Sequence, residues 1–253
     1  MDLCEIADNA ARHPWEISRV RALRTILTGG VKIDHNTTVL DVGCGDSYAA
    51  LNIFVGIPVK SIDGIDINLS DDRVKEQRNL SIPITIHNSF DGLKRNSFTL
   101  ILLLDVIEHL DDDESFLKDI VDRYLCRAGY ALITVPAFSA LFSSHDRFMK
   151  HRRRYDRPEF IDLLDRAGLM CVSHGYLFTS LLPIRLLVTA KERLVSSRKS
   201  PPKGVGGWDY SGFITGVIVS LLNAENTSVI TLNKFGIRLP GLSLWALCKK
   251  RQS

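Results

Sequence analysis

The stretch VLDVGCGDS, residues 39–47, is the most informative part of the sequence. Its apolar residues indicate a short buried strand over 38–42. A turn that contains Gly43 and Gly45 follows, and residues 48–54 then have the pattern of a helix. Glycines in such a turn permit a positive φ and let a ligand approach the backbone closely. The stretch therefore predicts a strand, a ligand-binding turn and a helix in succession.

A second predicted strand ends in an acid that suits the same site. The sequence IDGID, residues 62–66, places Asp66 about twenty residues beyond the glycine turn. A carboxylate at this position can accept hydrogen bonds from both hydroxyls of a ribose. A glycine turn alone is weak evidence for a ligand. The turn, the spaced acid and the strand context together are much stronger evidence.

The rest of the chain alternates apolar runs with amphipathic stretches, which is typical of a sheet built from strand–helix–strand units. Strands are predicted at residues 38–42, 61–65, 83–87, 99–104, 130–135, 170–178 and 243–249. Helices are predicted at residues 15–27, 48–54 and 112–125, with another between Asp156 and Gly168. We therefore expect an α/β fold, in which helices flank a mostly parallel sheet and the final strand is antiparallel.

Composition excludes several classes of protein. The chain has 253 residues, of which 45% are hydrophobic and 24% charged, so it is neither wholly disordered nor fibrous. A net charge of +3 is too small to indicate nucleic-acid binding. The cysteines are scattered without a CxxC pair, so we expect reduced thiols and neither a zinc site nor a disulfide framework. The first residues lack the pattern of a signal peptide, and we expect a cytoplasmic protein.

The sequence DVGCG, residues 41–45, resembles the first motif of the class I S-adenosylmethionine-dependent methyltransferases. The resemblance implies S-adenosylmethionine as the cofactor, with Asp41 at its cationic amino end and Asp66 at its ribose. Residues 88–90 fall where the family has its adenine-facing loop. The residues expected to bind the cofactor are Asp41, Gly43, Cys44, Gly45, Asp66, Ile67, Ser89, Phe90 and Asp105. The family often has a further glycine where Ser47 stands.

Other motifs extend the resemblance over nearly the whole chain. The sequence DVIEHL, residues 105–110, is similar to the fourth-strand motif of the methyltransferase-11-like group. The segments HPWE, VPAF, SHD, HRRRY and PGLSL resemble a bacterial group that is often found with polysaccharide or glycolipid biosynthesis; they occupy residues 13–16, 135–138, 144–146, 151–155 and 240–244. The resemblance implies a doubly wound, mostly parallel seven-stranded sheet of the Rossmann-like methyltransferase fold.

A basic segment between His145 and Arg157 allows two interpretations. One is a solvated or internally salt-bridged loop. The other is an anion site for the acceptor, in which arginines bind phosphate or carboxylate through paired N–H bonds. The candidate acceptor-binding residues are Arg152, Arg153, Arg154 and Tyr155. At least one of the three arginines is expected to turn inward to an acid, and Tyr155 also suits a packed phenol.

A hydroxyl acceptor needs a base to remove its proton, and imidazole titrates near neutrality. The candidates are His145, His151 and His109, and each of them also suits a structural role. Asp105, Glu108 and His109 can order the next turn, or can hold a divalent metal as is implied by a related quinone-biosynthesis group. We expect no metal.

We expect methylation, by preference on oxygen, of a small-molecule or lipid-linked acceptor that is a glycan or a phenol. Two other classes of function stay open. One is a nucleotide-dependent oxidoreductase on a similar sheet, although the helix after the turn lacks the glycine that such a phosphate site requires. The other is a member that binds the cofactor without catalysis. Sequence leaves the oligomeric state unknown.

Residues 179–240 form an insertion before the last strand that is much longer than an ordinary loop. We expect a methyltransferase core of residues 1–178 and 241–253 and a helical subdomain of residues 179–240. The insertion has two apolar segments around a polar piece, residues 196–207, and more basic than acidic residues. Such a segment suits peripheral contact with an anionic membrane or a lid over a lipid-linked acceptor. The alternative is a helical hairpin packed on itself, on the sheet or on a second subunit.

Overall fold

The computed structural model describes residues 12–69, 84–195, 208 and 210–252. Their seven-stranded sheet has the order β3-β2-β1-β4-β5-β7-β6. The strands are β1 (Thr38–Val42), β2 (Ser61–Ile65), β3 (Ile84–His87), β4 (Phe98–Leu104), β5 (Leu125–Pro136), β6 (Leu169–Leu177) and β7 (Ser243–Lys250). β7 is antiparallel to both β5 and β6, and the other pairs are parallel. The predicted α/β class and the mostly parallel sheet of seven strands are confirmed.

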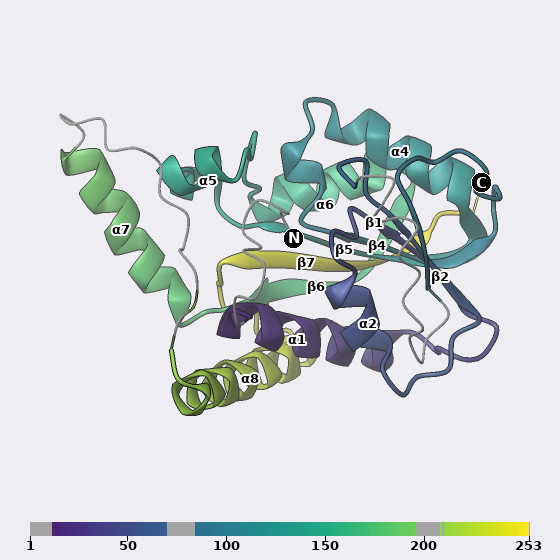
Figure 1. Cartoon of the computed structure of the whole chain (residues 1–253). Helices are drawn as coiled ribbons and strands as arrows, with labels where there is room; N and C mark the ends of the chain where they lie inside the picture. The colour runs from purple at the N-terminus through teal and green to yellow at the C-terminus, as the bar shows by residue number, and fades with distance from the viewer. Residues whose placement is uncertain (1–11, 70–83, 196–207, 209, 253) are drawn as a thin grey trace.

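Helices cover both faces of the sheet (Figure 1). On one face lie α1 (Pro14–Gly30), α2 (Tyr48–Phe54) and α8 (Gly212–Lys234). On the other lie α4 (Asp113–Tyr124) and α6 (Arg157–Arg166). Two more helices, α5 (Ser144–Phe148) and α7 (Leu181–Val195), lie to the left of the strands in Figure 1.

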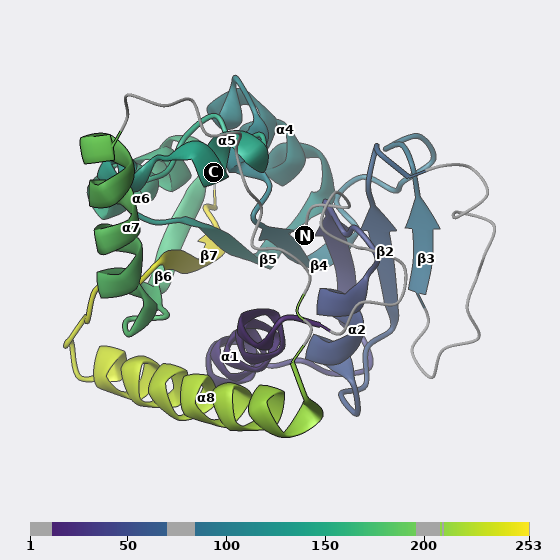
Figure 2. The same ribbon diagram turned by 60° about the vertical axis from the view of Figure 1, so that its left-hand side comes forward.

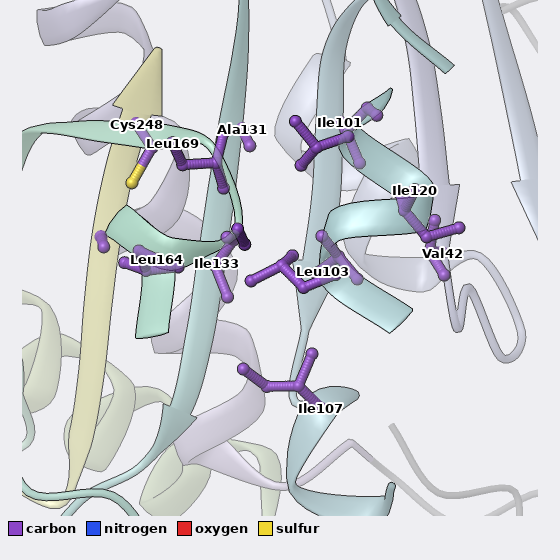
Figure 3. Close-up of a cluster of buried hydrophobic side chains, with 14 of the residues drawn as sticks. Val42, Ile101, Leu103, Ile107, Ile120, Ala131, Ile133, Leu164, Leu169 and Cys248 are labelled. Atoms are coloured by element: carbon purple, nitrogen blue, oxygen red, sulfur yellow. The ribbon is translucent and has the colours of Figure 1, made fainter. Parts of the chain in front are cut away.

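The hydrophobic core has two parts because side chains along a strand alternate between the faces of a sheet. In β4, Leu100 and Leu102 pack toward α1 and α2, whereas Ile101 and Leu103 pack toward α4 and α6. Figure 3 shows the second cluster. β4 is therefore buried on both faces, as its continuous apolar sequence predicts.

The insertion contributes the helices α7 and α8, of which α8 packs on the core. α8 runs beside α1 in both views of the ribbon (Figures 1 and 2). Its buried Asn226 joins it to the core by accepting a hydrogen bond from the backbone of Phe178 and donating one to Ser18. Within the described part of the chain, α8 is the helix that is long and apolar enough to span a membrane, a property shared by core helices of other proteins. The polar piece at 196–207 lies outside the described residues.

The structure differs most from the predicted elements in three places. β5 begins at Leu125, because residues 126–129 extend the strand beyond the apolar run that predicts it. α8 is longer than the apolar segment 213–222 that suggests it, since polar residues continue the helix to Lys234. α5 has no counterpart among the predicted helices, because one short turn leaves no periodic pattern.

Candidate active site

The glycine turn stands at the carboxyl end of β1, the edge at which open α/β sheets bind ligands. Gly43 has a φ of 71°, and a Cβ placed on it would lie 2.6 Å from a methyl carbon of Val106. The backbone N–H groups of Gly43 and Cys44 both donate to the carbonyl of Ile65 at the end of β2. Gly43 is therefore required both for its conformation and for its lack of a side chain.

Asp66 is tied to the same turn. One oxygen of its carboxylate accepts from the backbone of Gly45 at 3.1 Å, and the other accepts from the backbone of Asn68 at 2.9 Å. A carboxylate oxygen has further lone pairs, so Asp66 can still accept hydrogen bonds from a ligand. The two predicted parts of the cofactor site, the turn and the spaced acid, are in direct contact.

Asp41 is buried beneath the turn, and among the described residues its Oδ2 has no hydrogen-bond partner. Burial, with the Asp66 charge nearby, raises the pKa of Asp41 to about 7. A small pocket beside it is lined by residues of the turn and by Glu16 and Arg19 of α1. A buried carboxylate oxygen without a partner is suited to receive a cation such as an ammonium group.

Asp105 follows β4 in an uncommon backbone conformation, with a φ of 57°. Its carboxylate accepts a hydrogen bond from Thr134 at 2.8 Å and pairs with Arg19 of α1 at 2.8 Å. Burial opposes ionisation of Asp105, but the Arg19 guanidinium and the Thr134 hydroxyl outweigh it and lower its pKa. Arg19 therefore joins α1 to the ends of β4 and β5.

A cavity of about 780 Å³ opens at this edge of the sheet, a size suited to a cofactor and a small acceptor. Its walls include five of the residues predicted to bind the cofactor, namely Gly43, Asp66, Ile67, Phe90 and Asp105. Polar side chains from the segments after β4 and β5 also line it, namely His109, Arg147, Lys150, His151 and Arg152. The cofactor motif and the basic segment therefore share one cavity.

His151 lines this cavity and is held by a buried acid. Its Nδ1 lies 3.1 Å from Oδ1 of Asp146, which is fully buried on α5. Arg154 donates to the same oxygen at 2.7 Å, and Arg185 pairs with the other at 3.1 Å. Burial alone would raise the pKa of Asp146, but His151 and the two arginines outweigh it and lower the pKa. Asp146 therefore stays ionised and fixes the imidazole of His151.

Arg185 brings the insertion into this network, because it comes from α7. Glu192 of the same helix accepts hydrogen bonds from the backbone and the hydroxyl of Ser144, and Arg193 donates to the carbonyl of Ala140. α7 is thus fastened along the segment that carries Asp146. Asp146, which holds His151, is itself held by Arg185, a residue 39 positions later in the sequence.

His109 and Glu108 lie beside His151. The rings of His109 and His151 meet edge to face with centroids 4.8 Å apart. Glu108 is fully buried, and both of its carboxylate oxygens lack a hydrogen-bond partner among the described residues. Burial and the nearby Asp105 raise the pKa of Glu108 well above its usual value. The ligand atoms of these three residues lie within 4.8 Å of one another, so they can also hold a metal ion.

The other predicted acceptor residues make internal contacts. Arg153 pairs with Asp113 at 3.3 Å, Arg154 is buried against Asp146, and the Tyr155 hydroxyl donates to Asp113 at 2.6 Å. Arg153 and Arg154 thus turn inward to acids, as expected of at least one arginine. Of this predicted set, Arg152 lines the cavity.

The remaining predicted residues are placed as follows. Cys44 packs within the turn, where burial raises the pKa of its thiol and keeps it neutral. Gly45 has a φ of 53° in the same turn. The Ser89 hydroxyl contacts Asp91 beside Phe90, which stacks on Tyr124. His145 is half-buried on α5 and does not line the cavity.

Sequence reasoning missed several residues that build the site, namely Arg19, Asp146, Arg147, Lys150 and Arg185. Arg147 and Lys150 lie in the basic segment that the sequence identifies, and two of the others also had a signal. Asp146 stands in the SHD motif, and Arg185 is a lone cation inside an apolar run. Neither signal predicts that the two side chains meet, because they are separated by 39 residues of sequence.

Comparisons with known proteins agree with this geometry. The model of the family described as "Methyltransferase domain" matches residues 15–174. A search of curated proteins finds no match. Among solved structures, the 4+2 cyclase SpnF is similar with 16% identity and a TM-score of 0.58, over 97% of this chain and 86% of that one.

Two further solved structures are similar. An S-adenosylmethionine-dependent methyltransferase from Mesorhizobium loti has 12% identity and a TM-score of 0.55, over 92% of this chain and 98% of that one. Phosphoethanolamine N-methyltransferase 2 from Haemonchus contortus, solved with S-adenosyl-L-methionine, has 16% identity and a TM-score of 0.54. The similarity covers 92% of this chain and 52% of that enzyme. At these identities the structures establish the fold alone.

The family implies S-adenosylmethionine as the cofactor, and the residues present fit it. The buried Asp41 offers an unpartnered carboxylate oxygen to a cation, Gly43 leaves room where a Cβ would collide, and Asp66 faces the cavity. These features are complementary to the positive charge and to the shape of this cofactor. The chain therefore belongs to the methyltransferase domain family, with S-adenosylmethionine as its cofactor.

Proposed function

We propose that the protein is an O-methyltransferase in which His151, oriented by Asp146, removes the proton of an acceptor hydroxyl. The observation that carries this proposal is the pair itself. The imidazole lines the cavity, and its Nδ1 lies 3.1 Å from a buried carboxylate. An aspartate in this position fixes the tautomer that leaves Nε2 free to accept a proton, and stabilises the imidazolium that then forms.

The cofactor-binding residues have separate roles in this proposal. Asp41 binds the amino group, Gly43, Cys44 and Gly45 follow the methionine part, and Asp66 with Ile67 binds the ribose. Ser89 and Phe90 belong to the adenine end, and Asp105 closes the site at the end of β4. The position of the cavity supports this order, because it opens at the edge of the sheet where parallel strands end and five of these residues line it, namely Gly43, Asp66, Ile67, Phe90 and Asp105.

The cofactor supplies a methyl group that is activated by the positive sulfur to which it is attached. The work of the chain is to hold the acceptor oxygen in line with that methyl and to move one proton. The proton of the acceptor passes to Nε2 of His151, and the ionised Asp146 balances the new positive charge. His109 packs against the same imidazole and restricts its orientation. The predicted base His145 is assigned no part in this step.

The test uses methyl-labelled S-adenosylmethionine and a cell extract that contains small molecules and lipids. The variant His151→Gln is expected to lower labelling about 10²- to 10⁴-fold, the usual contribution of a general base. Its affinity for S-adenosylhomocysteine is expected to stay unchanged. His174→Gln, which replaces a half-buried histidine of β6 outside the cavity, is the matched control. Full activity of His151→Gln would overturn the assignment.

The same experiment separates the alternatives. A wild-type protein that binds S-adenosylhomocysteine and labels nothing would support a non-catalytic member. An oxidoreductase would instead be stabilised against heat by a nicotinamide dinucleotide. Activity that is lost with a chelator and restored by a divalent cation would show that Glu108, His109 and His151 hold a metal, against our expectation of none.

A lipid-linked acceptor is the second candidate, favoured by the exposed apolar side chains of the insertion. Ile184, Leu187 and Leu194 on α7 and Phe213 and Leu221 on α8 are all exposed. In this proposal the protein is cytoplasmic, and these side chains make peripheral contact with an anionic membrane. The basic residues of 196–207, which contribute to the predicted charge, lie outside the described part of the chain.

Sedimentation with anionic vesicles tests this second candidate. The double variant Leu187→Glu/Leu194→Glu is expected to remove binding, because it places two acids on the apolar surface. Met170→Glu replaces an exposed apolar residue of β6 and serves as the control. If the wild type ignores the vesicles at low salt, or the double variant binds them as well as the wild type does, the membrane contact is wrong.

A further inference from the structure

We propose that Arg147, Lys150 and Arg152 form a binding site for a phosphoryl group carried by the acceptor. The three side chains line the cavity that also contains Gly43, Asp66 and His151. They come from α5 and the loop that follows it. This inference rests on the proposed function, because it names the chemical class of the acceptor that binds in the same cavity.

The backbone holds these three residues in place. Lys150 has a positive φ of 58°, which is uncommon for a residue other than glycine or asparagine. His151 donates from its backbone to the carbonyl of Asp146 at 2.8 Å and closes this turn. The backbone of Arg152 donates to the carbonyl of Glu108 at 2.7 Å. The cations therefore extend from a fixed turn that is bound to the segment after β4.

The charges of this segment divide into two groups. Arg154 and Arg185 point to the buried Asp146, and Arg153 pairs with Asp113. By contrast, neither Arg147 nor Lys150 has an ion-pair partner among the described residues. Arg152 lies 3.4 Å from Asp111, and both of these side chains are largely exposed. The first group is neutralised inside the protein. The second leaves a net positive charge at the cavity.

The cofactor does not account for this positive charge. Its cationic amino end is assigned to Asp41 in the small pocket beside α1, where Arg19 is the nearby cation. Asp105, which follows β4 and lines the cavity, is already paired with Arg19. A second ligand in the cavity therefore meets uncompensated cations close to His151, which is the arrangement that recognises an anion.

A phosphoryl group fits these donors better than a single carboxylate does. Two guanidinium groups and an ammonium can together reach several oxygens of one phosphate or pyrophosphate, and arginine forms paired N–H bonds to such groups. The exposed position of the three side chains leaves room for a charged ester that extends toward solvent. The phosphate can be carried by a soluble ester or by a lipid.

Calorimetry with inorganic pyrophosphate, on protein saturated with S-adenosylhomocysteine, tests this site. Saturable binding is expected, and the double variant Arg147→Ala/Lys150→Ala should weaken it about tenfold or more. The double variant Lys118→Ala/Arg127→Ala removes two exposed cations from α4 and β5 and should bind like the wild type. Higher salt should weaken binding to the wild type, because exposed cations are screened.

The outcomes separate this inference from the proposed function. No saturable binding of pyrophosphate, or equal loss in the two double variants, overturns the phosphoryl site. His151→Gln is expected to keep pyrophosphate affinity while losing methyl transfer, so a failure of the catalytic assignment leaves this result intact. Unchanged melting temperature and S-adenosylhomocysteine affinity in Arg147→Ala/Lys150→Ala show that the variant is folded.

Two further probes identify the source of the phosphate. A soluble sugar phosphate that competes with pyrophosphate indicates a free ester. If vesicles that contain a phosphatidic acid compete with pyrophosphate and the sugar phosphate does not, the phosphate is carried by a lipid. Competition by either one supports the site. Failure of both to compete with pyrophosphate would contradict the proposal that an organic phosphoryl group is its ligand.

Discussion

The cofactor end and the acceptor end of the cavity are built in different ways. The cofactor end is local, because Asp41, Gly43 and Gly45 are near neighbours in the chain, and Gly45 donates a hydrogen bond to Asp66, which directly follows the adjacent strand. The acceptor end depends on Asp146, which binds side chains from two later segments of the chain. Backbone geometry shapes the first, and buried charge holds the second. The two ends should therefore respond differently to substitution.

The largest expected effect is at the acceptor end. Asp146→Ala removes the acid shared by Arg154 and Arg185 and leaves two guanidinium groups unpaired near His151. Unfolding by urea is expected to show a loss of about 3–5 kcal/mol, as for other broken buried ion pairs. Asp111→Ala, which removes the exposed partner of Arg152, should have almost no effect. Equal stability of the two variants would contradict the stabilising role of the buried Asp146 and its two arginine partners.

At the cofactor end, a single acid should affect binding more than folding. Asp66→Ala is expected to weaken S-adenosylhomocysteine binding by about 1.5–3 kcal/mol, the range for hydrogen bonds to a charged group. Calorimetry provides the measurement. Asp63→Ala serves as the control, because Asp63 is on β2, the strand that Asp66 follows, but pairs with His87 outside the cavity. Unchanged affinity in Asp66→Ala would remove Asp66 from the cofactor site.

The pKa of Asp41 gives the cofactor end a pH dependence. Because that pKa is raised to about 7, the carboxylate is largely protonated at pH 6 and charged at pH 8. S-adenosylhomocysteine has a cationic amino group over most of this range, so its affinity should rise with pH through 7. The gain is at most about 1.4 kcal/mol per pH unit. Calorimetry should also detect proton release on binding below pH 7.

Asp41→Asn provides the control for this pH dependence. It cannot ionise, so both the change in affinity and the proton release should disappear. If the wild type binds equally well at pH 6 and pH 7.5, or if Asp41→Asn keeps the dependence, another group is responsible.

The smallest expected effect concerns Ser47, which stands where the family often has glycine. Its φ of 63° is left-handed, a conformation that costs residues with a side chain more than it costs glycine. Ser47→Gly is expected to raise the free energy of unfolding by about 0.5–1 kcal/mol. Ser47→Ala keeps the unfavourable conformation and should give no gain. A loss of stability in Ser47→Gly would show that the contacts of the Ser47 side chain contribute more to the free energy of unfolding than its backbone conformation costs.

The comparison also explains what sequence could predict. The turn at 41–45, Asp66 and the sheet follow from local patterns, because neighbouring residues determine strands, turns and their order. The sequence identifies Tyr155 as a candidate but does not predict its position, since its partner Asp113 is 42 residues away in the chain. Arg19 and Arg185 act through contacts with distant segments. Sequence periodicity carries no information about such pairs.

A crystal structure of the protein with S-adenosylhomocysteine would show whether the cofactor end and the acceptor end serve one methyl transfer. We expect the ribose to contact Asp66, the amino group to contact Asp41, and the sulfur to face the part of the cavity lined by His151. A ligand bound outside this cavity, or one whose sulfur faces away from His151, would contradict this expectation.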